Sequence, residues 1–334
     1  MNANIDITTA EAMDDLHTCL VALHQVAQAR GHDHYMHHVV QDTCTFIVAT
    51  ASANWPDGLR DVLALRYSEG LGFDLMARIG RTVAGNASRP TFSAAHGPDI
   101  LAPVYLNLVC PDYEEGHLLT WENACAMAVA ASNAMAQALG TRMNAANAKL
   151  QAVDANNASI IKAKAVALDK AMEAAVEADD GRAGVAILRA MARLIEGVIF
   201  PSLAAHGIEV EPVHMFTPVM GSGRLVLAVA SAMPSYAQAG VLKFHGQDLD
   251  PTLVCIAKAN MHAAGLGACI GDMRWTLGNG LAKTPLPPID AIIAKAAADW
   301  PSKGVATLRE HSRTSHRMTP VLAAVPAPPW PPEV

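Results

Sequence analysis

The chain has 334 residues, of which 51% are hydrophobic and 16% charged, and its formal net charge is −7. A chain with so many apolar and so few charged side chains can bury a sizeable core, which excludes extensive disorder. The negative charge argues against broad nucleic-acid binding, which needs a basic surface. The length is sufficient for two domains of ordinary size.

Three further features predict a cytoplasmic protein with no membrane attachment. The six cysteines include no C-x-x-C pair, which favours reduced thiols over a disulfide framework. The N-terminal segment MNANIDITTAEAMDD lacks the basic and apolar regions of a signal peptide. No apolar run approaches the roughly 18 residues that are needed to cross a bilayer.

The first element in chain order is a helix over residues 9–30. Thr8 and Glu11 form a capping box at its start, and apolar residues follow at helical spacing. Gly31 stands where a glycine commonly ends a helix. We expect this helix to lay one face against a sheet.

Two stretches resemble each other, residues 34–79 and residues 214–256. Matching residues occur in the same order in both, which favours an internal duplication. The alternative is that the two segments are unrelated and look alike because each forms a strand, a turn and a helix. The matched positions are Thr50–Ala53 with Val229–Ala232, Pro56 with Pro234, Leu65–Tyr67 with Leu242–Phe244, and Asp74 with Asp250.

Each copy predicts a β-hairpin followed by a helix. The runs 45–51 and 225–230 are short, apolar and partly β-branched, which favours strands. Before the second run, Gly221-Ser222-Gly223 supplies the positive φ of a tight hairpin turn. Pro56 and Pro234 then end the strands, since proline lacks the ladder donor.

The rest of the chain divides at changes in composition. Residues 104–109 predict a further strand, residues 118–180 predict alanine-rich helices, and residues 185–205 predict an apolar helix. The fold expected is α/β, with two related three-layer α/β sandwich domains joined by alanine-rich helices. The predicted ranges are 1–117 for the first α/β domain, 118–182 for the helical connector, 183–318 for the second α/β domain, and 319–334 for an extended proline-rich tail.

The order of elements in the two copies resembles that of the LuxR-type autoinducer-binding domain. In that family a helix, a hairpin, a proline and a helix precede an aspartate that opens a further helix. In the second copy, Pro234 precedes Asp250-Pro251 at a spacing that suits the family. In the first copy, the positions that resemble the motif are Tyr35, Trp55, Tyr67 and Asp74.

The resemblance implies an α/β/α sandwich that buries an acyl-homoserine lactone, in a relative without the helix-turn-helix DNA reader. Asp74 and Asp250 would then hold the polar head of the ligand. Helix N-capping is the favoured alternative for both aspartates. The ligand-binding residues implied are Tyr35, Trp55, Tyr67, Asp74 and Asp250.

A histidine cluster, His32, His34, His37 and His38, follows the first helix. Imidazoles at this density can bind a transition metal. No complementary group of cysteine, histidine or aspartate accompanies them in the sequence, so we expect a solvated edge or a polar pocket wall and no metal site.

No catalytic motif is recognisable. Gly221-Ser222-Gly223 lacks the lysine and the strand–helix context of a phosphate loop, and neither a G-x-S-x-G elbow nor an H-E-x-x-H motif occurs. The carboxylates before His117 are better explained as an acidic turn ahead of a helix than as an acid–base pair. We therefore expect no catalytic residue and no cofactor.

These features favour a non-enzymatic small-molecule sensor or regulatory protein without its own DNA-binding domain. The alternative is a structural or protein-interaction component of an assembly, and an enzyme of unrecognised class comes third. The partners expected are a small apolar ligand and either a second copy or another protein, with no nucleic acid and no membrane.

Overall fold

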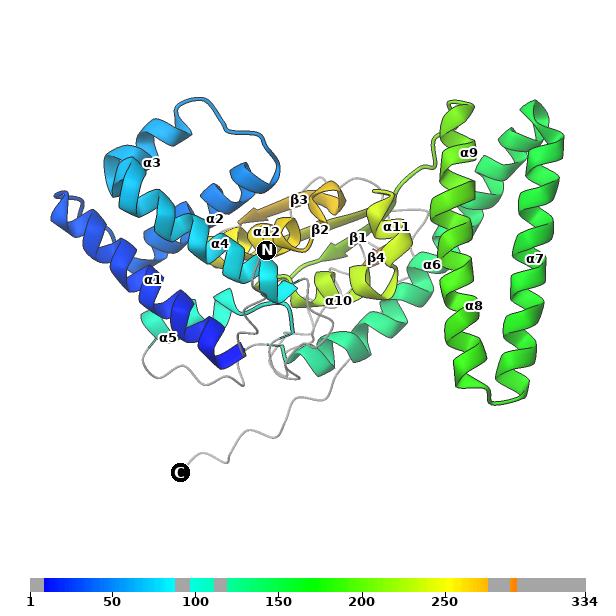
Figure 1. Cartoon of the computed structure of the whole chain (residues 1–334), viewed down its shortest axis with the longest axis horizontal. Helices are drawn as coiled ribbons and strands as arrows, with labels where there is room; N and C mark the ends of the chain where they lie inside the picture. The colour runs from blue at the N-terminus through cyan, green and yellow to red at the C-terminus, as the bar shows by residue number, and fades with distance from the viewer. Residues whose placement is uncertain (1–8, 88–96, 111–118, 276–288, 293–334) are drawn as a thin grey trace, which may run out of the picture.

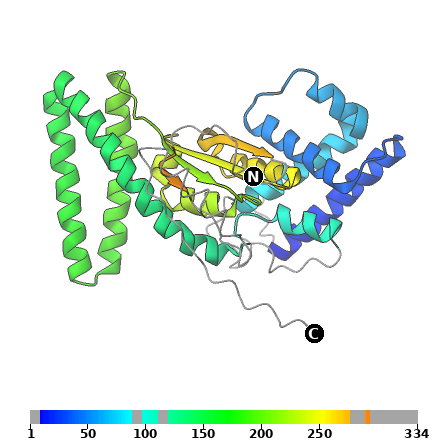
Figure 2. The ribbon, with the colours of Figure 1, turned by 180° about the vertical axis from the view of Figure 1, so that it is seen from behind.

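The structure, a computed structural model, describes residues 9–87, 97–110, 119–275 and 289–292. Three parts follow one another along the long axis (Figure 1): a lobe of helices, a parallel sheet with its own helices, and a projecting helical hairpin. The view from behind shows the sheet between the other two parts (Figure 2). The fold is α/β overall, as predicted.

The N-terminal lobe is helical throughout its described residues. Its first helix ends as predicted at Gly31, which has φ 81°, and the N–H groups of Gly31 and His32 close the last turn. The predicted cap Thr8 lies outside the described residues. The elements are α1 (Thr9–Ala29), α2 (Met36–Ala51), α3 (Leu59–Tyr67), a π-helical turn (Ser68–Gly72), α4 (Phe73–Ala87) and α5 (Leu101–Val109).

Both strands predicted for this lobe are wrong. Residues 45–51 lie inside α2, and residues 104–109 lie inside α5. In α2 the hydroxyls of Thr43 and Thr45 donate to carbonyls four residues earlier. These hydrogen bonds satisfy the threonine side chains within a helix, so β-branching alone did not decide the local structure.

A four-stranded sheet forms the middle of the molecule. Its order is β3-β2-β1-β4, and every strand pair is parallel. Parallel neighbours need crossover connections, which here contain helices. The elements are β1 (Val213–Thr217), α10 (Arg224–Ala232), α11 (Pro234–Gln238), β2 (Leu242–Asp248), α12 (Pro251–Ala263), a 3₁₀ turn (Gly267–Cys269), β3 (Ile270–Trp275) and β4 (Ala291–Ile292).

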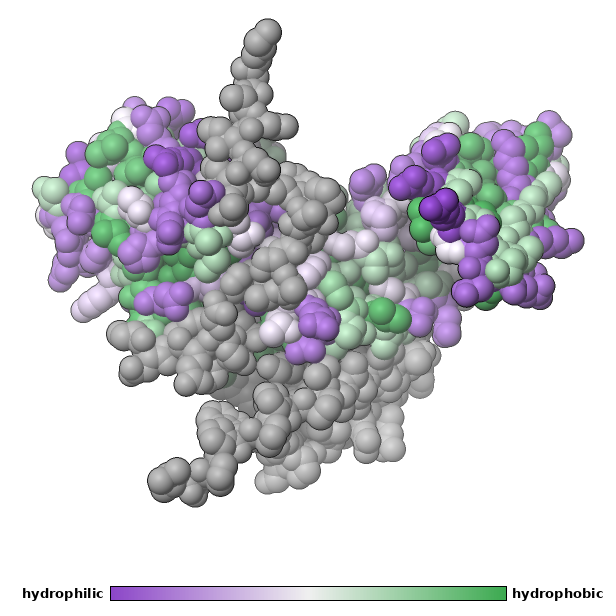
Figure 3. All heavy atoms as spheres, turned by 60° about the horizontal axis from the view of Figure 1, so that its bottom comes forward, coloured by the Kyte–Doolittle hydropathy of each residue, from purple (hydrophilic) through white to green (hydrophobic). Residues whose placement is uncertain are grey.

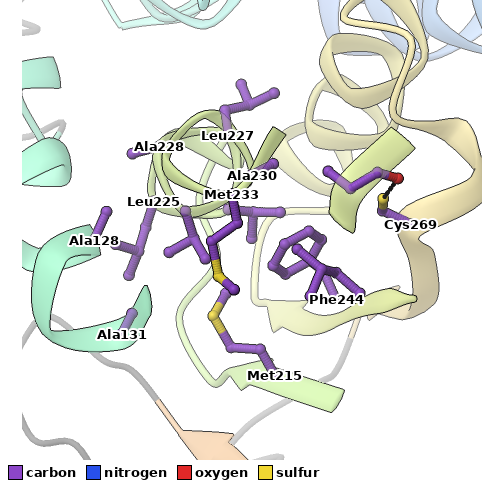
Figure 4. Packing of buried hydrophobic residues seen from close by; sticks show 14 of the residues in the cluster. Ala128, Ala131, Met215, Leu225, Leu227, Ala228, Ala230, Met233, Phe244 and Cys269 are labelled. Carbon is purple, nitrogen blue, oxygen red and sulfur yellow. Dashed lines mark hydrogen bonds between the residues drawn. The ribbon is translucent and has the colours of Figure 1, made fainter. Parts of the chain in front are cut away.

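The strand predicted at residues 225–230 is wrong, because this run forms the middle of α10. The run LVLAVA is buried all round, so it carries no periodicity that separates a strand from a buried helix. Figure 4 shows why it is buried: Leu225 faces Ala128 of α6, while Met215 and Phe244 of the strands lie on the other side of α10. Alanine at both helix surfaces lets α10 and α6 approach closely.

Helix α12 joins the sheet to the N-terminal lobe. Its residues Ile256 and Ala259 are fully buried and belong to the core of that lobe, together with Val40 and Ile47 of α2. Val254 and Ala257 of the same helix belong to the core of the sheet. The two hydrophobic cores therefore meet at α12. The predicted domain boundaries stay a prediction.

The alanine-rich segment is helical, as predicted. Asp154 and Asp180 cap two of its helices by accepting hydrogen bonds from backbone N–H groups. The helices α7 and α8 form an antiparallel hairpin that projects from the sheet (Figures 1 and 2). The elements are α6 (Trp121–Val153), α7 (Ala155–Glu177), α8 (Gly181–Leu194), a π-helical turn (Ile195–Ile199) and α9 (Phe200–Ala205).

The predicted duplication is not shown. The regular elements of residues 34–79 are all helices, whereas residues 214–256 alternate between strands and helices, so the two stretches do not share one structure. The two related sandwich domains are therefore absent from the described residues. The predicted tail at 319–334 lies outside those residues.

Among the described residues, no helix combines the length and the apolar character that crossing a membrane requires.

Candidate functional site

The candidate site lies at the carboxyl edge of the parallel sheet, where β1 and β2 end. In open α/β sheets this edge is where ligands generally bind. A glycine-rich turn leads from β1 into α10 there, and Gly221 and Gly223 have φ 54° and 84°. A Cβ atom at Gly223 would lie 3.1 Å from Cβ of Ala257 in α12. The turn thus needs glycine for its backbone conformation and for its close approach to α12.

Asp248, the last residue of β2, holds this turn. The N–H of Gly221 donates to Asp248 Oδ2 at 2.7 Å, and the N–H of Asp250 donates to Asp248 Oδ1 at 3.0 Å. The N–H of Met220 donates to the carbonyl of Gln247 at 3.0 Å. The Asp248 residue is half-buried, and its two oxygens have lone pairs beyond the two used here. It can therefore accept further hydrogen bonds from a bound ligand.

A buried polar network lies behind the turn. Asp99, which is 0% exposed, accepts hydrogen bonds from Ser222 Oγ at 2.5 Å, Arg224 Nε at 2.9 Å and Asn260 Nδ2 at 3.0 Å. Its Oδ1 also accepts from the N–H of Ala102 at the start of α5. The first turn of α10 is thus held to the N-terminal lobe by a carboxylate of the protein itself.

Two further features shape the floor of the site. The hydroxyl of Thr217, at the end of β1, is buried and has no hydrogen-bond partner among the described residues. A Cβ atom at Gly246 would lie 2.5 Å from Sδ of Met220, so the glycine in β2 makes room for the turn. An orphaned buried hydroxyl at a strand end is a group that a bound ligand can satisfy.

Asp250 begins α12, and its predicted capping role is confirmed. Its carboxylate accepts from the N–H of Thr252 at 2.7 Å, and Pro251 occupies the first helical position. Burial raises the pKa of Tyr105 to about 12, so its hydroxyl stays protonated and donates to Asp250 at 3.4 Å. A ligand role for Asp250 stays a prediction.

Asp74 is exposed and lies in the first turn of α4. Its predicted N-capping role is wrong, because α4 continues directly from the π-helical turn before it and has no free N-cap position. Asp74 belongs to the helical lobe, whereas the candidate site lies at the carboxyl edge of the sheet. Its predicted role in ligand binding is not tested.

The three aromatic residues proposed from the sequence occupy different surroundings. Tyr35 precedes α2, is 66% exposed and stacks on His37 at 5.6 Å. Trp55 packs edge-to-face against Phe46 at 5.4 Å. Tyr67 is fully buried and donates to Asp42 at 2.9 Å. Their roles in ligand binding stay predictions.

The histidine cluster surrounds the start of α2. His37 Nε2 and His38 Nε2 lie 3.1 Å apart, and the rings of His34 and His38 lie 5.4 Å apart. Burial, followed by the charge of His38, lowers the pKa of His37. Within the described residues, no group of three or more potential ligands has the geometry to hold a metal ion.

A separate cavity of about 300 Å³ lies between α6, α7 and α9. Leu139, Met143 and Ile161 contribute apolar walls, and Lys162 lies at the cavity. None of the side chains proposed from the sequence lines it.

Asp99, Ser222, Arg224 and Asp248 are site residues that the sequence did not predict. A signal was present, because a Gly-x-Gly turn after one apolar run is followed by an aspartate at the end of the next. The segment after Gly223 was predicted to be a strand, so the turn was interpreted as part of a β-hairpin. It is in fact the turn between strand β1 and helix α10.

Comparisons with known proteins find no matching family model and no matching curated protein. One similar solved structure is a Listeria monocytogenes protein assigned to the class I S-adenosylmethionine-dependent methyltransferases, with 12% identity and a TM-score of 0.37; the match covers 92% of this chain and 64% of that one. Another is the methyltransferase subunit of a type I restriction-modification system from Streptococcus thermophilus, with 14% identity, a TM-score of 0.25, and coverage of 86% and 63%. The chain spans less than two thirds of either structure, and these low scores by themselves establish no common activity.

The resemblance to a LuxR-type domain is wrong. The described residues hold a helical lobe and one parallel sheet where that family would require a hairpin-based sandwich. The expected sensor or regulatory function rested on this resemblance and is corrected with it, as is the leaning against an enzyme; the solved structures reported above are described as methyltransferases.

Proposed function

We propose that this chain is an S-adenosylmethionine-dependent methyltransferase that binds its cofactor at the carboxyl edge of the sheet. The observation that carries the proposal is the glycine turn after β1, held by Asp248 at the end of β2. In nucleotide-binding α/β folds, such a turn lets the backbone approach the ligand, and the acidic residue at the next strand end accepts hydrogen bonds from the ribose.

The surroundings of the turn favour a cofactor without phosphates. A dinucleotide places its pyrophosphate at the N-terminus of the helix after the turn. Here the buried carboxylate of Asp99 already bonds Ser222 and Arg224 at the start of α10, and a second anion beside it would be repelled. In addition, Val226 stands where the dinucleotide motif has its third glycine. A nucleoside with a cationic side chain suits this charge pattern better.

The residues present fit such a nucleoside. Asp248 has unused lone pairs for ribose hydroxyls, and Leu249, which is 66% exposed, offers an apolar contact next to it. The hydroxyl of Thr217, which has no hydrogen-bond partner among the described residues, lies at the end of the neighbouring strand. When bound, S-adenosylmethionine supplies an electrophilic methyl group on a sulfonium centre.

A cytoplasmic location is part of the same proposal. All six cysteines are free, and Cys19, Cys44 and Cys269 are buried. Free thiols are typical of proteins in reducing compartments.

Isothermal titration calorimetry tests the proposal with S-adenosylmethionine, S-adenosylhomocysteine and NAD⁺. We expect the two adenosyl compounds to bind and NAD⁺ not to bind. Asp248→Ala should weaken binding by about 10- to 100-fold, the loss expected for hydrogen bonds to a charged group. Asp57→Ala, which removes an exposed carboxylate of the helical lobe, serves as the matched control and should bind like the wild type.

Methyl transfer itself is tested by incubating the wild type with methyl-labelled cofactor and a cell extract. At a cofactor concentration near the wild-type Kd, label should pass into the acceptor fraction with the wild type, and much less of it should pass with Asp248→Ala. Tighter binding of NAD⁺ than of either adenosyl compound, or full affinity in Asp248→Ala, would overturn the assignment.

A further inference from the structure

The cavity of about 300 Å³ between α6, α7 and α9 lies where two hydrophobic clusters meet. Leu139 of α6 belongs to the core of the sheet, whereas Leu150, Ile161 and Leu203 belong to a second core formed by α6, α7 and α9. All four side chains are buried and line the cavity. Figure 3 shows the hairpin projecting from the rest of the molecule, and α7 of this hairpin forms one wall of the cavity. Since protein interiors contain few voids larger than a water molecule, an apolar hollow of this size has room for a ligand.

This cavity is a different site from the proposed cofactor site. Tyr236, which lines the cavity, belongs to α11, and α11 leads into the first residues of β2. The proposed cofactor site lies at the last residues of β1 and β2. A molecule in the cavity therefore lies toward the amino ends of the strands and leaves the cofactor site free.

Gly140 gives the cavity space that the packing of the chain does not require. It lies well inside α6, a helix of 33 residues, where glycine is less stable than alanine. Its φ is not positive, so the backbone conformation does not require glycine. A Cβ atom at Gly140 would have no neighbouring group within 4 Å. Because Gly140 lines the cavity, its missing side chain leaves open space there.

Lys162 is the only charged residue among the described residues that line the cavity. It is exposed, so it lies at the rim, and it makes no ion pair with another described residue. The residues three and four positions away in α7 are uncharged, so none of them neutralises it: Ala158, Ser159, Ala165 and Val166. The cavity thus offers one free cation, which is complementary to an anion.

Three uncharged polar side chains complete the lining. Asn144 and Asn147 lie on the same side of α6, and each amide has two N–H donors. Burial raises the pKa of Tyr236, so its hydroxyl stays protonated and can donate. The other lining residues are glycine or carry apolar side chains. Donors and a cation suit a carboxylate, and the apolar walls suit a hydrocarbon chain.

We propose that this cavity binds a small carboxylic acid with a hydrocarbon chain, whose carboxylate meets Lys162 and whose chain lies among Leu139, Leu150 and Leu203. An apolar cavity of about 150 Å³ can hold benzene, with its six carbons. The cavity here is about twice as large, so it has room for about ten to twelve non-hydrogen atoms, as in octanoate or decanoate. The proposal does not depend on the proposed methyltransferase activity.

Isothermal titration calorimetry with octanoate and octylamine tests the charge of the ligand. The two probes share a chain of eight carbons and differ in the sign of their charge. Octanoate should bind with one molecule per chain, and octylamine should bind more weakly because its ammonium group meets Lys162. Lys162→Gln should weaken octanoate binding by about three- to tenfold and reduce the difference between the two probes. Lys164→Gln removes the same charge from α7 at a position that does not line the cavity, so it should bind like the wild type.

Gly140→Leu tests the position of the hydrocarbon chain. Leucine is a good helix former and enters open space, so this variant should melt at the wild-type temperature or higher. It should bind octanoate at least about tenfold more weakly, because the added side chain fills the cavity. Gly184→Leu is the control: its Cβ also has nothing within 4 Å, but Gly184 lies in α8 and does not line the cavity. Its affinity for octanoate should equal that of the wild type.

A wild type that binds neither octanoate nor decanoate would overturn the proposal. So would octylamine binding as tightly as octanoate, unchanged octanoate affinity in Lys162→Gln, or wild-type affinity in a folded Gly140→Leu. Circular dichroism shows whether the leucine variant folds. If it does not, the two probes and Lys162→Gln still decide, because they leave the helix backbone of α6 unaltered.

Discussion

Arg224 and Asp99 form an ion pair of 2.9 Å in which the side chains are 4% and 0% exposed. Arg224 is the first residue of α10, and Asp99 precedes α5, so the pair joins the sheet to the N-terminal lobe. Removal of one partner leaves the other charge buried without compensation, which is far more destabilising than loss of a surface pair. The glycine turn depends on this contact, because Ser222 within the turn bonds the same carboxylate.

Asp99→Ala should therefore lower the free energy of unfolding by about 3–5 kcal/mol. The measurement is urea denaturation, followed by circular dichroism. Glu69→Ala is the control, because it removes the Arg60–Glu69 pair, in which both side chains are mostly exposed, and should change stability by less than about 1 kcal/mol. Equal effects of the two substitutions would show that the buried pair does not hold the sheet to the N-terminal lobe.

The two glycines of the turn should respond differently to alanine. Gly221→Ala introduces a Cβ atom with nothing within 4 Å, so it meets only the penalty of a positive φ, about 1 kcal/mol. Gly223→Ala meets the same penalty, and its Cβ lies 3.1 Å from that of Ala257. We expect Gly223→Ala to be the more destabilising of the two in urea denaturation. The reverse order would contradict the close approach of the turn to α12.

The pH dependence of stability should include a contribution from His262 in α12. Burial lowers the pKa of His262 below its ordinary value of 6.5. Below pH 6.5 the unfolded chain therefore takes up a proton that the folded protein does not, and stability falls as the pH decreases toward the folded pKa. Above pH 6.5 the histidine is neutral in both states and contributes no pH dependence.

His262→Gln removes this titration. Urea midpoints measured at pH 7.5 and pH 5.5 should fall less in the variant than in the wild type, while carboxylates, which are the same in both proteins, cancel in the comparison. An equal fall in both proteins would mean that His262 titrates alike when folded and unfolded.

Local signals in the sequence were sufficient where they were unambiguous. The end of α1 at Gly31, the alanine-rich helices and the cap at Asp250 follow from propensity and capping chemistry, and the structure confirms each. The residues around α10 show where local signals fail. LVLAVA is buried on every side, so only its position between two parallel strands makes it a helix.

The candidate site depended on that same distinction. Asp99 and Ser222 are 123 residues apart, and nothing in the local sequence of either predicts their contact. The pairing of Gly221 with Asp248 becomes visible only once β1 and β2 are known to be parallel neighbours. Tertiary contacts between distant segments, rather than motifs, therefore define the site.

The N-cap of α12 offers the most local test. The Asp250 carboxylate accepts from the N–H of Thr252 at 2.7 Å, and it lies at the positive end of the helix dipole. Asp250→Ala should lower the free energy of unfolding by about 1 kcal/mol, whereas Asp250→Asn, which keeps a capping oxygen, should lower it by a few tenths. Thermal and urea unfolding of both variants decide the matter.

Titration of the same two variants with S-adenosylmethionine separates capping from ligand binding. As a cap alone, Asp250 should be replaceable by asparagine without change in affinity, since Asp248 is the residue proposed to meet the ribose. A loss of affinity in Asp250→Asn at unchanged stability would instead assign Asp250 to the ligand. Unchanged stability in Asp250→Ala would remove the capping role, because no other side chain in the described residues bonds the N–H of Thr252.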